Sequence, residues 1–351
     1  MNLEWLLNHA NAPIKYILTQ NLSLVEDLPD NAEVRVWLAR LRQRAQEQNL
    51  NDIHGSHDYR MENILGKCWV LGLNKEVPQL NDCMQYILQF LNAHLQRDTL
   101  AESGYGKLYA TRDYETVLCC FLPFLGYQNH PAVQAITAKR IRILYNFTKQ
   151  KRYDIYVDAA NLKGIKSEWR QHVINSDLYA DGNIALPTVH DFILFAGMYK
   201  FLDAPAKQQV EAIVQWVLGE PYAHLHTRYG YFYVPDGAYA AKAIVFKMQL
   251  VNPQEADVNT GDLRSLLFVC FVLSHFQSAQ NSQWFATAMQ YFSRYKTENG
   301  RFLFPQHFIT EKPDTFVISG GHMNMGEDKR SKLCKEILST AWMERLSANL
   351  R

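Results

Sequence analysis

The stretch HGSHDYRMENILGKCWVLGL, residues 54–73, places a His-Asp-Tyr step directly before a long apolar run that ends in Leu-Gly. Similar stretches follow at 111–127, TRDYETVLCCFLPFLGY, and at 188–203, TVHDFILFAGMYKFLD. In each of them an acid precedes a segment that is apolar nearly all round, a pattern typical of a helix that is covered on both sides. Two further runs, 238–251 (AYAAKAIVFKMQLV) and 263–276 (LRSLLFVCFVLSHF), predict buried helices of the same kind.

Amphipathic segments alternate with these apolar runs. From residue 32 onward, Val34, Leu38, Leu41 and Ala45 recur at steps of four, three and four, with the charged residues on the other face. Segments 77–95, 206–219 and 282–295 repeat this helical period. The best candidate for an extended segment is YGYFYVP, residues 229–235.

Two kinds of alternating helix predict an all-α fold. If the apolar helices form an inner ring and the amphipathic helices surround it, the product is an α/α toroid with long loops gathered at one end. The breaks between helix pairs are too long and too uneven for a simple solenoid. We therefore expect one α/α-toroid domain over residues 1–351.

The composition narrows the class of function. The 351 residues carry a formal net charge of +1, which gives no electrostatic reason to expect a nucleic-acid partner. Aromatic residues make up 13%, enough to line a ligand cavity as well as a core. No window approaches 18 uninterrupted apolar residues, so no integral membrane segment is expected. Six cysteines without a C-x-x-C pair predict buried free thiols in a reducing compartment, hence a cytoplasmic protein.

The acids before the apolar runs have two interpretations. Asp58, Asp113 and Asp191, with Asp236 and Asp262 further along, suit ordinary capping of helix N-termini. In a toroid, however, the inner helices point the same way and bring these acids to one mouth of the hollow. Burial and a neighbouring carboxylate both raise the pKa of a carboxyl group, which is one route to a general acid.

The candidate site residues follow from this second interpretation. Asp58, Asp113 and Asp191 are candidate acids, and His57 and His190 are candidate base or orienting partners. His54 precedes the helix and is more simply interpreted as a loop residue than as a site residue. The candidate substrate-binding residues are Arg112, for an anionic group, and Tyr59, Tyr114, Tyr231, Tyr233, Asp236 and Tyr239.

No cofactor is expected, and the only metal candidates are weak. His224 and His226 form a His-x-His pair that would need a third ligand from elsewhere. Such a pair more often lies at the surface or makes local hydrogen bonds.

The order of these segments resembles the terpenoid cyclase/prenyltransferase-like α/α-toroid superfamily, and more narrowly a poorly characterised bacterial branch described as squalene cyclase-like. The resemblance lies in WLLNHANAPIKYILTQNL (5–22), FLGYQNHPAVQAITAKRI (124–141), TENGRFLFP (297–305) and LCKEILSTAWMERL (333–346). The chain departs from the family in its chemistry, because it contains no Asp-Asp dipeptide and so neither the D-x-D-D nor the D-D-x-x-D motif. The resemblance therefore implies the fold and leaves the reaction open.

The leading hypothesis is an enzyme that acts on a largely apolar, possibly terpenoid-like, small molecule by acid/base chemistry in a central aromatic-lined cavity. One alternative is a non-catalytic helical-repeat protein that binds a ligand or a protein. Another is a sugar-processing hydrolase or lyase, which would need two carboxyls facing each other across the hollow. The oligomeric state stays open. A hollow filled by side chains would argue against chemistry at its centre.

Overall fold

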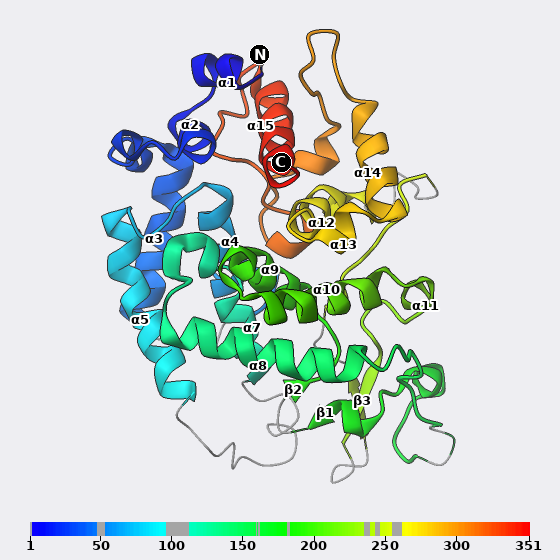
Figure 1. Cartoon of the computed structure of the whole chain (residues 1–351). Helices are drawn as coiled ribbons and strands as arrows, with labels where there is room; N and C mark the ends of the chain where they lie inside the picture. The colour runs from blue at the N-terminus through cyan, green and yellow to red at the C-terminus, as the bar shows by residue number, and fades with distance from the viewer. Residues whose placement is uncertain are drawn as a thin grey trace.

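The computed structural model describes residues 2–47, 53–95, 112–158, 160, 162–180, 183–234, 239–242, 246–254 and 262–351. These residues are mostly helical, which confirms the all-α prediction in its general form (Figure 1). No helix among them is long and apolar enough to cross a membrane. All six cysteines are buried and free, as predicted.

The helices follow one another with two short β-hairpins between them. Strand β1 (Tyr179–Ala180) pairs with β2 (Asn183–Ile184), and β3 (Tyr231–Val234) pairs with β4 (Tyr239–Lys242), both antiparallel. The α-helices are α1 (Asn2–His9), α2 (Ala12–Thr19), α3 (Ala32–Glu47), α4 (Met61–Val70), α5 (Pro78–Leu95), α7 (Arg112–Cys119), α8 (Pro131–Thr148), α9 (Val189–Met198), α10 (Ala204–Leu218), α11 (Glu220–Ala223), α12 (Leu266–Leu273), α13 (Gln277–Gln280), α14 (Gln283–Ser293) and α15 (Cys334–Asn349).

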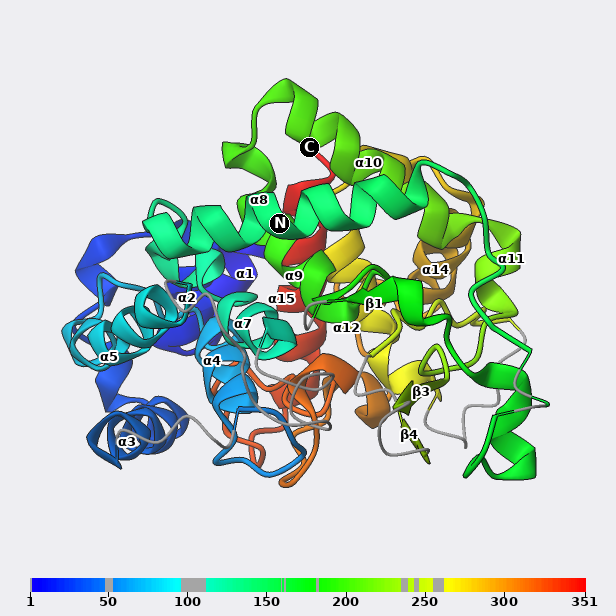
Figure 2. The same ribbon diagram turned by 90° about the horizontal axis from the view of Figure 1, so that it is seen from below.

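The two kinds of helix predicted from the sequence are present. All ten residues of α4 and all eight of α12 are buried, as are nine of the ten in α9. In α10, by contrast, five of fifteen residues are buried. Figure 2 shows α4, α7, α9, α12 and α15 in the middle of the molecule, with α3, α5, α8 and α10 around them. The amphipathic helices thus cover the apolar ones.

An aromatic layer fills the space between the buried helices. Trp69, near the end of α4, has five aromatic rings with centroids between 5.3 and 6.3 Å from its own: Phe121, Phe124, Phe268, Phe271 and Trp342. These rings come from the segment after α7, from α12 and from α15. The rings pack against one another between the helices, and Trp69, Phe124 and Phe271 also line a cavity.

Two of the repeated segments end in Leu-Gly for a backbone reason. Gly72 and Gly126 have φ angles of 74° and 92°, in the left-handed region that favours glycine. A Cβ on Gly72 would also lie 2.4 Å from Cγ1 of Ile17. The glycines end the buried segments and allow the chain to turn back into an amphipathic helix.

One predicted helix is wrong. Within residues 238–251, β4 is a strand, and residues 246–251 have no regular secondary structure. A short apolar run fits a buried strand as well as a buried helix, and periodicity alone does not separate the two. The extended backbone has a function in the fold, because the carbonyl of Phe246 accepts a hydrogen bond of 2.8 Å from the N–H of Val189, which opens α9. The extended segment predicted at 229–235 is confirmed by β3.

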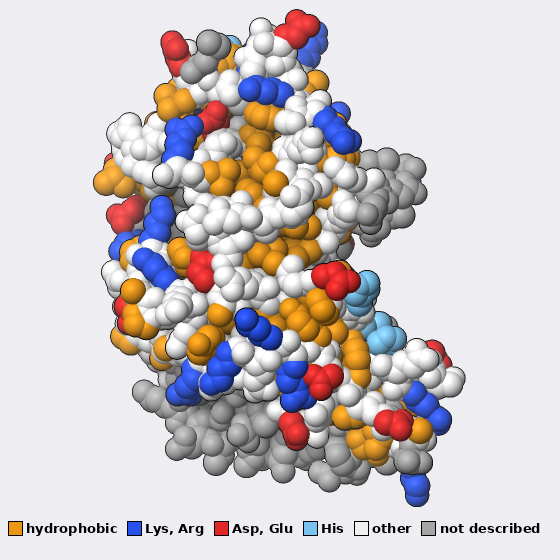
Figure 3. Space-filling model, turned by 45° about the vertical axis from the view of Figure 1, so that its right-hand side comes forward, with side chains coloured by type: hydrophobic (Ala, Val, Ile, Leu, Met, Phe, Trp, Pro, Cys, Tyr) orange, Lys and Arg blue, Asp and Glu red, His pale blue; other side chains and the backbone are white. Residues whose placement is uncertain are grey.

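Acidic and basic side chains are interspersed over the face shown in Figure 3. This distribution matches the near-neutral net charge.

Candidate functional site

A buried carboxylate lies between two imidazoles at the start of the buried helices. Glu62 Oε1 lies 2.8 Å from His190 Nε2, and Glu62 Oε2 is hydrogen-bonded to His54 Nδ1. The side chains of Glu62, His190 and His54 are 0%, 4% and 11% exposed, so His54 is the member that solvent or a ligand reaches best. We call these three residues the histidine cluster.

The first turn of α4 holds the loop that carries His54. The N–H of Glu62 donates to the carbonyl of Ile53 at 3.0 Å, and the Asn63 amide donates to the carbonyls of Gly55 and His57. The first bond satisfies a backbone N–H at the helix start that would otherwise lack a partner, and the other two come from the side-chain amide of Asn63. They also fold the loop back so that the His54 ring lies against Glu62.

His190 reaches the cluster because α9 begins beside α4. Thr188 caps α9, and Asp191 completes a capping box by accepting from the backbone N–H of Thr188 at 2.9 Å. Asp191 also binds Arg140 through both oxygens, at 2.7 and 3.1 Å. The start of α9 is therefore fixed, and the positive ends of two helix dipoles lie near the Glu62 carboxylate.

The charge of Glu62 depends on its two partners. Burial alone would raise the pKa of this carboxyl, but the charges and hydrogen bonds of His190 and His54 outweigh burial and lower the pKa to about 2. Glu62 is thus an anion at neutral pH, and it can accept an N–H from each ring.

A cavity of about 230 Å³ lies near this cluster, although His54, Glu62 and His190 are not among its lining residues. The His54 ring is 4.7 Å from the ring of Phe246 and 5.2 Å from that of Phe316, and both phenylalanines line the cavity. The other lining residues among those described are Val189, Thr227, Arg228, Lys247, Gln249, Ser265, Val269, Ile318 and Ser319.

The cavity carries positive charge. Lys247 donates from Nζ to the carbonyl of Leu225 at 2.8 Å, and its ammonium lies 4.5 Å from the centroid of the Tyr222 ring. Burial lowers the pKa of Lys247 to about 8. The Arg228 guanidinium lies 5.8 Å from the Phe246 ring. Among the described residues no carboxylate lines the cavity, so the two cations favour an anionic ligand.

The sequence-predicted residues fall in different places. His190 lies in the histidine cluster. In Asp191 beside it, Oδ1 accepts from Arg140 and Oδ2 accepts from Arg140 and Thr188. His57 is about half exposed and pairs with Asp314 at 2.9 Å. Asp58 does not cap α4, because the N-cap is Arg60 and Asp58 instead pairs with Arg40 at 3.1 Å.

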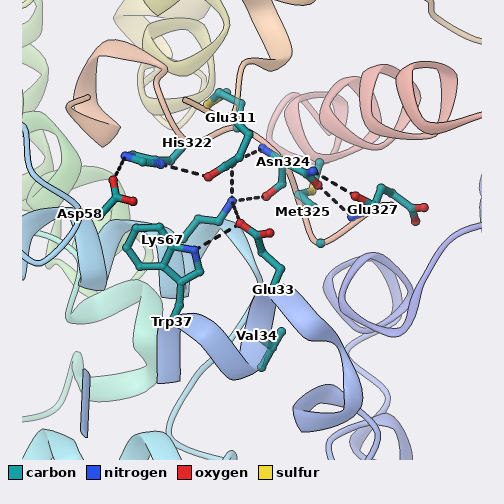
Figure 4. A network of polar contacts seen from close by, with 12 residues as sticks. Glu33, Val34, Trp37, Asp58, Lys67, Glu311, His322, Asn324, Met325 and Glu327 are labelled. Carbon is teal, nitrogen blue, oxygen red and sulfur yellow. Dashed lines mark hydrogen bonds and ion pairs between the residues drawn. The ribbon is translucent and has the colours of Figure 1, made fainter. Parts of the chain in front are cut away.

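Asp58 belongs to a second polar network on the same helix, shown in Figure 4. Lys67 is fully buried, and its ammonium contacts Glu311 Oε2 and the carbonyl of Asn324, both at 2.6 Å. His322 bonds Glu311 at 3.0 Å and lies 3.6 Å from Asp58. We call Lys67, Glu311, His322 and their partners the lysine network.

The predicted tyrosines whose side chains are described lie away from the cavity lining. Tyr59 is 46% exposed and stacks on His57. Tyr231 stacks on Trp169 with centroids 4.4 Å apart, and Tyr233 packs on a small separate apolar cluster.

The remaining predicted residues divide into two groups. Arg112, Asp113 and Tyr114 begin α7 and Tyr239 begins β4, but their side chains are not among those the structure describes; Asp236 lies outside the described residues. His224 is exposed and pairs with Glu220 at 2.9 Å, while the His226 ring lies 4.9 Å from that of His172. Within the described ranges, the one group with the spacing of metal ligands is His54, Glu62 and His190.

Sequence analysis missed Glu62 and treated His54 as a loop residue. One signal was present, because Glu62 is an acid inside a run that is otherwise almost wholly apolar. Burial of such a group requires partners, and those partners were 8 and 128 residues away along the chain.

A second cavity, of about 550 Å³, lies at the other ends of α9 and α12. Trp69, Phe124, Phe271 and Arg345 are among its lining residues. The aromatic layer thus borders this cavity, which is separate from the one beside the histidine cluster.

No family model, no curated protein and no solved structure matches the chain.

Proposed function

We propose that this chain is an enzyme that performs acid/base chemistry on a small anionic molecule with an apolar body. The observation that carries the proposal is the fully buried Glu62 carboxylate, hydrogen-bonded to two imidazoles beside a cationic, aromatic-walled cavity. A carboxylate that fixes an imidazole is a recurring arrangement in general acid/base catalysis.

His54 is the proposed proton-transfer residue. Glu62 accepts a hydrogen bond from the Nδ1–H of His54. This bond orients the ring and leaves Nε2 to exchange a proton with the ligand. His54 is also the most exposed of the three side chains. Glu62 and His190 are positioning residues, since His190 binds the other oxygen of Glu62 and holds it in place.

The cavity lining suggests the ligand class. About 230 Å³ is below the usual range of about 300–1,000 Å³ for pockets that hold drug-sized ligands, so the molecule is small. Phe246 and Phe316 suit an apolar body, and Lys247 and Arg228 suit a carboxylate or a similar anion. Two cations at the cavity disfavour a carbocation intermediate, which narrows the original terpenoid-like hypothesis.

The lining also weighs on the alternatives. Two carboxyls facing each other would favour a sugar-processing hydrolase, but the described lining contains none. A non-catalytic ligand-binding protein fits the cavity equally well and differs only in what happens to the bound ligand.

The architecture we propose for this enzyme is an α/α toroid, supported by the successive contacts of α4 with α7, α7 with α9, α9 with α12 and α12 with α15. The ring of Trp69 in α4 also lies 6.3 Å from that of Trp342 in α15. The histidine cluster would then lie where the inner helices begin. Six buried free thiols support a cytoplasmic setting.

Native mass spectrometry of the purified protein, followed by titration calorimetry with a panel of small carboxylates, tests the ligand class. We expect binding that Lys247→Met weakens at least about tenfold, because it removes a buried charge-assisted contact.

Proton transfer is tested by incubating each bound carboxylate in deuterium oxide and following deuterium incorporation or conversion by NMR. Wild type should exchange or convert the ligand, and Glu62→Gln should bind it without doing so. Binding with no exchange or conversion in the wild type would instead identify a ligand-binding protein.

A further inference from the structure

The histidine cluster has the composition of a catalytic zinc site. Two imidazoles and one carboxylate are the three protein ligands of one well-known class of catalytic zinc centres, in which a fourth position holds water or substrate. Structural zinc sites, by contrast, are closed by four protein ligands, usually cysteines and histidines. The three residues therefore suggest an open site.

The donor atoms are close enough to share one ion. Each residue offers one ligand atom, and these atoms lie within 4.8 Å of one another. Zn–N and Zn–O bonds of about 2.0–2.2 Å in a tetrahedron place ligand atoms about 3.4 Å apart. Nδ1 of His54 and Nε2 of His190 already point at opposite oxygens of Glu62, so small side-chain rotations would bring all three around one centre.

The electrostatics also favour a cation at this place. Glu62 is fully buried, and the groups bonded to it are imidazoles, which carry charge only when protonated. The nearby Asp191 is occupied by Arg140. In the lysine network the corresponding buried carboxylate, Glu311, has a permanent cation beside it, the ammonium of Lys67. When its two imidazole partners are neutral, Glu62 has no such charge beside it.

We propose that His54, Glu62 and His190 bind one Zn²⁺ ion, with the fourth position open on the side of His54. The proposal rests on the proposed function only in taking this cluster as the site. Binding replaces the two N–H···O hydrogen bonds. A neutral imidazole moves its proton to the nitrogen that faces away from Glu62 and gives the lone pair of the facing nitrogen to Zn²⁺, whereas a protonated imidazole releases the facing proton to solvent. Zinc affinity therefore falls as the imidazoles become protonated. A zinc-bound water has a pKa of about 7 and would supply a base at neutral pH.

The test uses the full chain freed of metal by dialysis against a chelator. Zn²⁺ is titrated by calorimetry, bound metal is counted by elemental mass spectrometry, and Co²⁺ is added as a spectroscopic probe of coordination. We expect one equivalent of Zn²⁺, and visible Co²⁺ absorption typical of a four-coordinate site. Loss of an outer-shell partner typically costs 10–100-fold in metal affinity, so loss of a ligand in Glu62→Gln or His190→Ala should cost about 100-fold or more.

Two further variants guard against misfolding and non-specific binding. His54→Ala removes the ligand on a loop and leaves α4 and α9 intact, so it should fold and still bind zinc weakly. His224→Ala removes an exposed histidine that pairs with Glu220, and it should bind zinc like the wild type. Equal zinc affinity in wild type and in His54→Ala, or no bound equivalent in the wild type, would overturn the proposal.

The outcomes separate this inference from the proposed function. Conversion of a carboxylate by the metal-free protein, with no gain on adding Zn²⁺, would support acid/base chemistry and remove the zinc site. Stoichiometric zinc that depends on all three residues, with no bound carboxylate, would keep the zinc site and remove the proposed ligand class.

Discussion

Helix α4 carries two buried charged residues five positions apart, Glu62 and Lys67, and their surroundings differ. Each is 0% exposed. Lys67 contacts two carboxylates and a backbone carbonyl, so a permanent positive charge meets permanent negative ones (Figure 4). Glu62 contacts two histidines, whose charge and tautomer both change.

This difference indicates a structural role for the lysine network and a chemical role for the histidine cluster. The lysine network joins α3, α4 and the segment from Glu311 to Asn324, and each charge in it has a fixed partner. Such a network holds segments in place. The His54 ring of the histidine cluster packs on Phe246 and Phe316, which line a cavity. The cluster can gain or lose protons without losing its hydrogen bonds, which is what a catalytic or metal-binding group requires.

The largest effect should come from removing the ammonium of the lysine network. In Lys67→Met, Glu311 stays buried with only His322 and the backbone N–H of Asn324 to balance its charge. Breaking a buried ion pair from one side typically costs about 3–5 kcal/mol of unfolding free energy. Urea denaturation followed by circular dichroism measures this loss.

Two variants serve as controls for Lys67→Met. Exposed Lys149→Met should change stability by less than about 0.5 kcal/mol, as surface substitutions usually do. Adding Glu311→Gln to Lys67→Met should restore part of the lost stability, because the unpaired charge is then gone. A double variant no more stable than Lys67→Met would show that the two residues are not coupled.

The next effect is acid sensitivity, which both regions should share. Burial would raise the pKa of Glu311, but the charge of Lys67 and the hydrogen bond of His322 lower it to about 2, the same value as for Glu62. A carboxyl whose pKa is lowered in the folded state stabilises the protein at pH values above 4.5, the pKa of the same carboxyl in the unfolded chain. That stability is lost as the pH falls from 4.5 towards 2.

Glu311 should contribute about 3 kcal/mol at neutral pH, and Glu62 should contribute in the same direction. Unfolding free energies measured at pH 6 and at pH 3 check this expectation. Glu62→Gln and Glu311→Gln should each flatten the pH dependence between these two values. An unchanged slope in either variant would contradict the low pKa of that residue.

A smaller effect should follow from Glu62→Gln at neutral pH. Glutamine has the same shape as glutamate. Its oxygen can accept a hydrogen bond from one imidazole, and its amide N–H can donate to the other. A neutral imidazole can switch tautomer and accept that N–H, whereas the ammonium of Lys67 has no such choice. We expect a loss of about 1–2 kcal/mol by urea denaturation. A loss as large as that of Lys67→Met would show that the histidine cluster is as rigidly specified as the lysine network.

The general fold was predictable from the sequence because burial leaves a periodic trace. Apolar runs gave the buried helices α4, α9 and α12, and the step of three and four gave the amphipathic α3. The run at 238–251 misled because its apolar residues fit a strand as well. The sequence shows Gly72 and Gly126 as members of Leu-Gly pairs, but it does not show that their φ angles are positive.

The candidate site was predictable only in part, since it is made by contacts between distant segments. His190 was expected near a mouth formed by helix starts, and it lies at the start of α9. Its partner Glu62 comes from a helix 128 residues earlier, and a single sequence carries no record of that contact. The neighbouring Asp58 matched the repeated pattern equally well, yet its loop turns it towards Arg40 and Asp314.

The smallest effect should come from Asp58→Asn, and it tests the comparison most directly. Asp58 pairs with Arg40, whose side chain is 33% exposed, and accepts the N–H of Asp314 at 3.1 Å. Asparagine keeps the acceptor for that N–H and loses a partly exposed ion pair, which is worth about 0–1 kcal/mol, together with the longer 3.6 Å contact between the carboxylate and His322. Because Asp58 belongs to the lysine network and does not line the cavity, neither carboxylate binding nor zinc affinity should change, as measured by calorimetry. A variant that folds with wild-type stability but no longer binds or converts the ligand would instead make Asp58 part of the functional site and move the chemistry from the histidine cluster to the lysine network.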